Sequence, residues 1–127
     1  MLNLIKPIPI YIKLYTDKVE ITRLDTDTTN TRLASEKFSN ARLVVANFYH
    51  AEQLTRAVIK ELISSKFLQP TLKILIQQMD KNEGGLSDVE KRVLRDLGEF
   101  VGGSLVKIVE QQTALTTAEA LLVLSEK

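Results

Sequence analysis

The sequence predicts a single α/β domain with a mixed sheet, because the spacing of its apolar residues changes along the chain. In the first third, apolar and polar residues alternate, as in strands that bury one face. After residue 47 the apolar residues recur every three or four positions, and helical stretches of this kind alternate with short apolar runs. A hairpin followed by two strand–helix–strand connections predicts a mixed sheet with helices on its faces.

The first strand is predicted over residues 8–16. Its alternation places one set of side chains on each face: Ile8, Ile10, Ile12 and Leu14 against Tyr11, Lys13 and Tyr15. Thr16-Asp17-Lys18 predicts a turn, and alternation from Val19 to Leu24 predicts a second strand and a hairpin. The polar run 25–31 predicts a loop. A weak third strand is expected within 32–38.

The next elements follow a helical period. Residues 48–67 predict a helix with Asn47 as its N-cap. Gln69-Pro70 should stop this helix, since proline cannot continue it. The run 72–76 then predicts a buried strand, followed by a loop over 80–85.

The second half of the chain carries a clear helix start. Ser87 and Glu90 have the spacing of a capping box, with Asp88 beside them at the positive helix end. The following helix is expected to bury one stripe with two flanking residues: Val89, Val93, Leu97 and Val101, flanked by Leu94 and Phe100. Gly102-Gly103 should end it. A strand over 104–109 and a last helix from Thr116-Thr117 complete the order β-β-(β)-α-β-α-β-α in one domain, 1–127.

Composition excludes several classes of protein. The 127 residues carry 17 basic and 16 acidic side chains, so no overall charge favours nucleic acid or an anionic membrane. The absence of cysteine excludes disulfides and thiolate metal sites and fits a cytoplasmic protein. The apolar start of the chain lacks a basic n-region and is interrupted by Lys6 and prolines, so a strand is expected there instead of a signal peptide. No apolar run approaches the ~20 residues of a membrane span.

Three stretches resemble one protein family. Residues 69–76, 88–97 and 102–110 are similar to a strand, a helix and a further strand of the bacterial actin MreB, the rod-shape-determining protein. Ala46-Asn47-Phe48 and Glu52 are similar to the start of its preceding helix. The spacing agrees over about residues 45–110, apart from a longer loop at 79–86. The resemblance implies a single ribonuclease-H-like, actin-like subdomain, whose element order the chain shares.

The departures from that family concern the nucleotide site. In the family the first strand ends in an Asp-x-Gly turn that holds phosphate and magnesium, whereas Lys13 and Tyr15 occupy those places here. A tyrosine prevents the close backbone approach that a glycine allows. Glu90 matches the family's water-positioning glutamate. The chain has room for one of the two subdomains that enclose a nucleotide, so no cofactor is expected.

Other candidate sites have plainer interpretations. Glu90 is a relic catalytic candidate, but the capping box explains it without chemistry. Gly84-Gly85 lacks the lysine-serine continuation of a phosphate loop. His50 is the only histidine, which suits neither a triad nor a metal site. Asp25 and Asp27 lack the glycine and glutamate of a calcium loop. No metal is therefore expected.

A protein-docking surface is the remaining possibility. The candidate residues lie on the first strand, on the helix after residue 87 and on the last helix: Tyr11, Tyr15, Lys91, Arg92, Arg95, Leu121, Leu122 and Leu124. Plain core packing is the alternative for the apolar ones, and a solvated helix face for the basic ones.

The sequence thus favours a non-enzymatic MreB-like interaction module in a cytoskeletal, cell-shape or envelope-associated complex, with a protein partner or a second copy. Two alternatives stay open. One is a nucleotide-binding or ATPase subunit completed by a partner chain. The other is a ribonuclease-H-like nucleic-acid-binding domain, against which the balanced charge argues.

Overall fold

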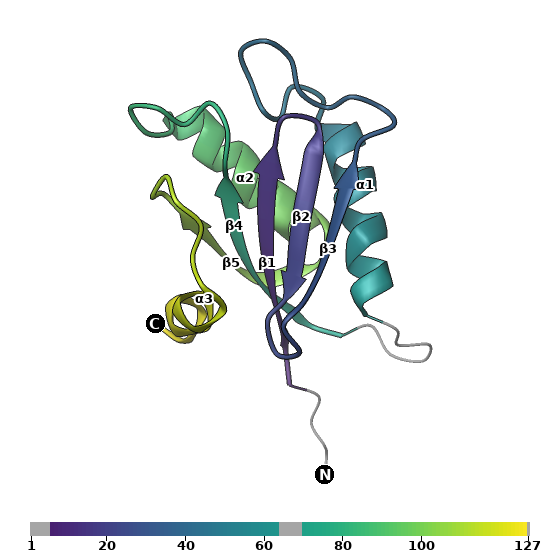
Figure 1. Ribbon diagram of the computed structural model, residues 1–127, viewed down its shortest axis with the longest axis vertical. Helices are drawn as coiled ribbons and strands as arrows, with labels where there is room; N and C mark the ends of the chain where they lie inside the picture. The colour runs from purple at the N-terminus through teal and green to yellow at the C-terminus, as the bar shows by residue number, and fades with distance from the viewer. Residues whose placement is uncertain (1–5, 64–69, 127) are drawn as a thin grey trace.

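The computed structural model describes residues 6–63 and 70–126. Five strands and three helices follow one another in these residues (Figure 1): β1 (Ile8–Tyr15), β2 (Lys18–Arg23), β3 (Thr28–Leu33), α1 (Phe48–Leu62), β4 (Leu72–Gln78), α2 (Asp88–Phe100), β5 (Gly103–Val109) and α3 (Thr117–Ser125). This order confirms the predicted fold class.

The strands form one mixed sheet in the order β3-β2-β1-β4-β5. β1 pairs antiparallel with β2 and β2 with β3, whereas β1–β4 and β4–β5 are parallel. β1 therefore lies at the centre, between the antiparallel and the parallel half. The two sides of β1 have different surroundings. Ile10 and Ile12 belong to one apolar cluster, and Tyr11 belongs to another on the opposite face.

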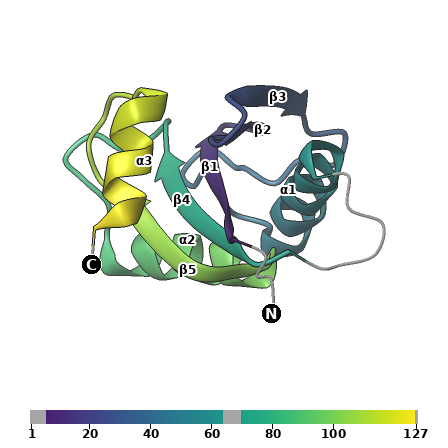
Figure 2. The same cartoon turned by 90° about the horizontal axis from the view of Figure 1, so that it is seen from below.

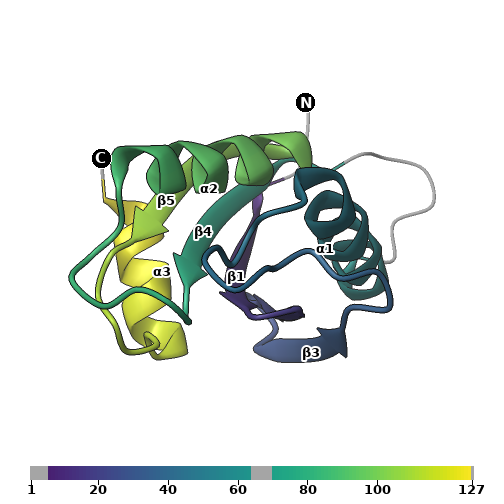
Figure 3. The ribbon, with the colours of Figure 1, turned by 90° about the horizontal axis from the view of Figure 1, so that it is seen from above.

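One face of the sheet packs against α1 and α2, as Figures 2 and 3 show. The side chains buried there are apolar and come from β1, β2 and β4, including Ile10, Ile12, Ile21, Ile74 and Ile76, each 0 % exposed. β5 adds the half-buried Val106 and Ile108. Burying each such side chain contributes roughly 1.5–3 kcal/mol to the free energy of unfolding. This face holds the main core.

The opposite face is covered only in part. α3 packs there across β4 and β1 and, with neighbouring side chains, forms a second, smaller core: Tyr11, Leu24, Leu75, Val109, Ala120 and Leu124. Figure 2 shows α3 on one side of the sheet, with α1 and α2 on the other. The β2–β3 part of this face has no helix packed across it among the described residues.

The predicted helix starts are confirmed. The Asn47 side chain accepts the His50 amide at 3.0 Å at the start of α1. Ser87 and Glu90 form a reciprocal capping box on α2, and Thr116 and Glu119 form one on α3. Gly102 ends α2 with a φ of 113°, a conformation that a glycine adopts without strain.

The placement of the third strand was wrong. β3 occupies Thr28–Leu33, mostly within the predicted loop 25–31, whereas residues 34–38 form no strand. Asp27, with a φ of 54°, closes the turn after β2, and pairing with β2 supplies the backbone hydrogen bonds of the strand. Three β-branched threonines in β3 fit this pairing.

Two helix expectations also need correction. α1 ends at Leu62, with Ile63 extended, instead of reaching residue 67; the predicted continuation over 64–67 and Gln69 of the stop lie outside the described residues. On α2, Val89 and Phe100 do not join the core, because they are 72 % and 59 % exposed. The side that faces the sheet instead centres on Leu94, Leu97, Gly98 and Val101.

Candidate functional site

The turn between β1 and β2 is the place where the family resemblance would put a phosphate, and side chains of this chain occupy it. The Thr16 amide donates to the Asp80 carboxylate at 2.7 Å, and Lys81 Nζ lies 3.0 Å from Thr16 Oγ1. Asp80 and Lys81 follow the end of β4, which neighbours β1. A backbone amide that would meet a phosphate oxygen is therefore satisfied by a carboxylate.

Asp17 fixes the other side of this turn. Asp17 adopts a left-handed backbone conformation, with a φ of 52°. Its carboxylate accepts the amides of Phe38 and Ser39 at 2.9 and 2.8 Å, and its own amide donates to Ser39 Oγ at 3.0 Å. The side chain thereby holds the segment before α1 against the hairpin. Its role in this arrangement is structural.

Lys13 and Tyr15 lie on the sheet face opposite the main core. Lys13 Nζ forms an ion pair with Glu20 at 2.6 Å, and Lys18 Nζ lies 4.3 Å from the centroid of the Tyr15 ring. Burial raises the pKa of Tyr15, and the charges of Glu20 and Asp80 raise it further. The turn is thus surrounded by charges of both signs, with Lys13 and Lys18 beside Glu20 and Asp80.

Glu90 is held in the capping box. Its carboxylate accepts the Ser87 amide at 2.9 Å, and Gln78 Nε2 lies 3.4 Å away. The hydrogen bond from the Ser87 amide lowers the pKa of Glu90, and the Gln78 contact lowers it further, so the carboxylate is ionised and engaged. A lowered pKa makes a carboxylate a weaker base, so this arrangement favours the structural interpretation.

A shallow apolar hollow lies beside Glu90. It has a volume of about 40 Å³ and lies between α2 and the segment before α1; its lining includes Leu43, Val44, Val45, Val89 and Val93. A volume of this size admits one aliphatic or aromatic tip and no nucleotide. Nothing in the sequence indicates this hollow, because Leu43 and Val89 lie far apart in the chain.

The candidate docking residues divide into buried and exposed ones. Tyr11 and Leu124 are 2 % and 4 % exposed, so the core-packing alternative holds for both and neither offers a docking surface. Their burial follows from α3, which lies directly over β1 and β4. Leu121 and Leu122 stay on the outer side of α3, at 39 % and 64 % exposed.

The buried Tyr11 instead fixes the last helix. Its hydroxyl donates to Gln77 Oε1 and accepts the Leu115 amide at 3.0 Å. Gln77 Nε2 in turn donates to the carbonyls of Gln111 and Thr113, each at 2.9 Å. This polar latch (Tyr11, Gln77, Leu115) ties the segment before α3 to the sheet. Burial raises the pKa of Tyr11, which keeps its hydroxyl protonated.

The basic residues of α2 behave differently from one another. Lys91 pairs with Glu110 at 3.1 Å, whereas Arg92 lies 3.8 Å from Asp96 and its side chain is 78 % exposed. Arg95 is exposed as well. Arg92 and Arg95 are therefore exposed, and their part in docking stays a prediction.

His50 lies at an open groove of about 500 Å³, lined also by Tyr49, Gln53, Leu54 and residues 34–36. Its Nδ1 lies 3.1 Å from the Lys37 carbonyl, which fixes the ring as a structural contact. Within residues 6–63 and 70–126 no three metal-binding side chains come together. In the same ranges no helix is long and apolar enough to cross a membrane.

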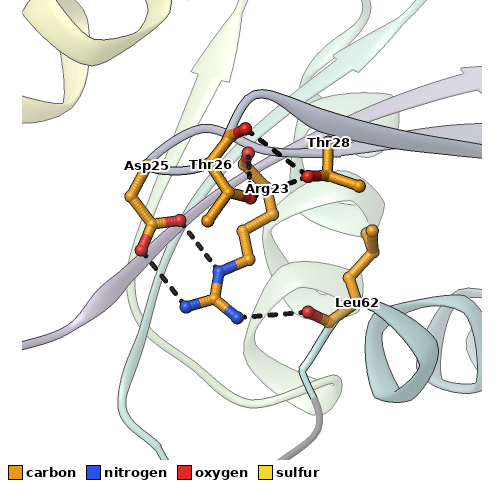
Figure 4. A network of polar contacts seen from close by, with 5 residues as sticks. All are labelled: Arg23, Asp25, Thr26, Thr28 and Leu62. Atoms are coloured by element: carbon orange, nitrogen blue, oxygen red, sulfur yellow. Dashed lines mark hydrogen bonds and ion pairs between the residues drawn. The ribbon is translucent and has the colours of Figure 1, made fainter.

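At the opposite end of the hairpin, a polar cluster links β2 to α1 (Figure 4). Arg23 contacts the Asp25 carboxylate through Nε at 2.9 Å and a terminal nitrogen at 3.3 Å, and donates to the Leu62 carbonyl at 3.2 Å. A cation at the carbonyl end of a helix is favourable. The hydrogen bond from Arg23 lowers the pKa of Asp25. The cluster joins the end of β2 to the end of α1, with Asp25 engaged by Arg23.

The described residues form a mixed sheet with helices on both faces, and a solved structure supports an actin-like fold for this arrangement. The ethanolamine utilization protein EutJ from Carboxydothermus hydrogenoformans superimposes with a TM-score of 0.52 at 14 % identity, over 83 % of this chain. The match spans 38 % of the EutJ chain, well under half of its length. No protein-family model matches the sequence.

A sequence relative places the chain more narrowly. The chain is 32 % identical over 100 residues to the Escherichia coli (strain K12) protein named "Uncharacterized protein YjaA", covering 71 % of this chain and 77 % of the relative. The chain belongs to the YjaA family.

Proposed function

We propose that this chain is a non-enzymatic protein-interaction module built on one actin-like subdomain. The observation that supports the proposal best is the occupied turn between β1 and β2. Thr16 donates its amide to Asp80, and Lys13 at the family's Asp position is paired with Glu20. A phosphate at this turn would therefore have to displace the Asp80 carboxylate from the Thr16 amide.

A second observation concerns the start of α2. The amides there are free anion-binding groups in an uncapped helix, but Ser87 and Glu90 satisfy each other's amides here. Asp88 adds a negative charge at the same place. The two positions suited to phosphate in this fold therefore both carry carboxylates, which favours binding of protein over binding of nucleotide.

Isothermal titration with ATP and Mg²⁺ tests the proposal. The expected result is no binding. Micromolar affinity would overturn it and favour the alternative of an ATPase subunit. In that event Glu90→Ala distinguishes the roles of Glu90: loss of hydrolysis in a folded protein indicates catalysis, whereas loss of thermal stability indicates the cap.

A matched variant sharpens the titration. Asp80→Asn keeps the shape of the side chain while removing the charge beside the Thr16 amide. If repulsion by carboxylates alone prevented nucleotide binding, this variant would gain measurable affinity. We expect the variant still to bind no nucleotide, because Tyr15 occupies the family's glycine position.

The nucleic-acid alternative is tested by the same preparation. A ribonuclease-H-like binder would show an affinity for RNA or DNA that falls steeply with salt. The near-balanced charge predicts no such binding. The resemblance of residues 45–110 to MreB directs the search for protein partners to cytoskeletal, cell-shape and envelope-associated complexes.

A further inference from the structure

The outer side of α2 carries a set of apolar side chains that the fold leaves uncovered. Val89 and Phe100 are 72 % and 59 % exposed, and Leu43, which lines the hollow with Val89, is 41 % exposed. Figure 3 shows α2 along the outside of the molecule, with no element over it. Val89, Val93 and Phe100 recur at helical spacing, so they form one stripe along the helix. We call these three residues and Leu43 the α2 stripe.

The stripe has an apolar hollow at one end and an exposed aromatic ring at the other, so a second copy could fit against it. Val89 and Val93 line the apolar hollow at one end of the helix. Phe100 projects at the other end, where its ring meets Phe48 edge-on at 5.4 Å. The helix rises about 1.5 Å per residue, so the two ends are roughly 16 Å apart. An antiparallel second copy of α2 therefore brings each Phe100 to the hollow of the other copy.

The charges beside the stripe agree with the same arrangement. Arg92 and Asp96 lie one turn apart on one flank of the helix, and Arg92 is 78 % exposed. In an antiparallel pair that sets Val89 against Phe100, Arg92 of each copy lies about one residue from Asp96 of the other. A two-fold axis places the same flank of both helices together, so both pairs form at once.

We propose that this chain self-associates through an antiparallel pairing of α2 with α2 of a second copy. Phe100 of each copy enters the hollow lined by Leu43, Val89 and Val93 of the other, and Arg92 pairs with Asp96 across the contact. The inference rests on the proposed function as a protein-interaction module, for which it names a second copy of the chain as the partner.

The first test is the solution mass by sedimentation across a wide range of protein concentration. The wild type should form a dimer, and Val89→Glu should weaken it at least tenfold. Because Val89 is exposed and an acid near a helix start is favourable, the variant should stay folded, which circular dichroism checks. Leu122→Glu, at a similarly exposed leucine on α3, is the control and should dimerise as the wild type does.

A charge exchange tests the pairing itself. Arg92→Glu and Asp96→Arg should each weaken self-association, because each variant sets like charges against one another. An equimolar mixture of the two variants should form a mixed dimer, since every contact across it again joins opposite charges. If Arg92 and Asp96 interacted only within one chain, mixing the two variants would not restore association.

The absence of cysteine allows the orientation to be tested by cross-linking. A mixture of Val89→Cys and Phe100→Cys should form a mixed disulfide on oxidation, whereas Val89→Cys alone should form little. A wild type that remains monomeric, or a dimer disrupted by Leu122→Glu and not by Val89→Glu, would overturn the inference. The titration with ATP and Mg²⁺ decides the proposed function separately, since a monomer without nucleotide binding can still bind another protein.

Discussion

The two faces of the sheet are stabilised in different ways. The face under α1 and α2 is closed by apolar side chains from four strands and two helices. The face under α3 has a small apolar cluster and depends on the polar latch of Tyr11, Gln77 and Leu115. The free energy gained from apolar burial grows with the buried area, and the first face buries far more of it. We therefore expect the first face to unfold only with the whole domain, whereas α3 can detach locally from the second face.

Neighbouring residues of β4 give the sharpest test of this comparison. Ile76 faces the main core and Leu75 faces α3, and both are 0 % exposed. Ile76→Ala should lower the free energy of unfolding by about 2–5 kcal/mol and affect all slowly exchanging amides alike. Leu75→Ala should reduce hydrogen-exchange protection in α3 first. Equal losses across the domain in both variants would show that the two faces unfold as one unit.

The packing of α2 on β5 tests the tightness of the first face. A Cβ at Gly98 would lie 2.7 Å from Val106 Cγ1, so Gly98→Ala should cost about 1–3 kcal/mol, measured by urea unfolding. Combining it with Val106→Ala should recover part of that loss, because the methyl groups that clash are removed. Additive losses in the double variant would contradict the steric explanation.

The latch is tested by Tyr11→Phe. This change keeps the ring and removes the hydroxyl, which leaves Gln77 Oε1 and the Leu115 amide without their partner. We expect a loss of about 1–3 kcal/mol, concentrated in the exchange of amides 111–125. Tyr15→Phe is the matched control, since the Tyr15 hydroxyl makes no hydrogen bond within the described part of the chain. Similar effects of the two variants would argue against the latch.

The smallest expected effect is the pH dependence of the α2 cap. The pKa of Glu90 is held below its ordinary value of 4.5 in the folded chain. The cap therefore contributes its full stability above that value and loses it as the pH falls through the lowered pKa. Glu90→Gln retains a hydrogen-bond acceptor but does not titrate. It should reduce the loss of unfolding free energy between about pH 5 and 3 by less than about 1 kcal/mol. An unchanged slope would mean that other carboxylates dominate.

Local chemistry made most of the elements predictable. The alternation in β1 and β2, the caps at Asn47, Ser87 and Thr116, and the glycine after α2 act within a few residues of each other. These signals yielded the order of the elements, and from it the mixed sheet. They failed at β3, whose threonines and asparagine have a weak pattern and whose pairing with β2 decides its place.

The candidate site was only partly predictable for the same reason. The sequence identified Lys13, Tyr15 and Glu90, because each departs from or matches a local motif. It gave no sign that Asp80 meets the Thr16 amide, a contact between residues 64 positions apart. Likewise the exposed Arg92 was expected, but the hollow beside Glu90 depends on the packing of residues 43–45 against α2.

The sequence by itself determined the hairpin, the helix boundaries set by caps, and the alternation of strands and helices, because short-range sterics and hydrogen bonds encode them. Tertiary structure alone decided which apolar residues are covered. Tyr11 and Leu124 became core because α3 lies over β1 and β4, and Val89 and Phe100 became surface because α2 turns Leu94 and Leu97 to the sheet. Burial depends on neighbours that are distant in sequence. Periodicity therefore predicts that a helix forms, whereas tertiary packing decides which of its sides is exposed.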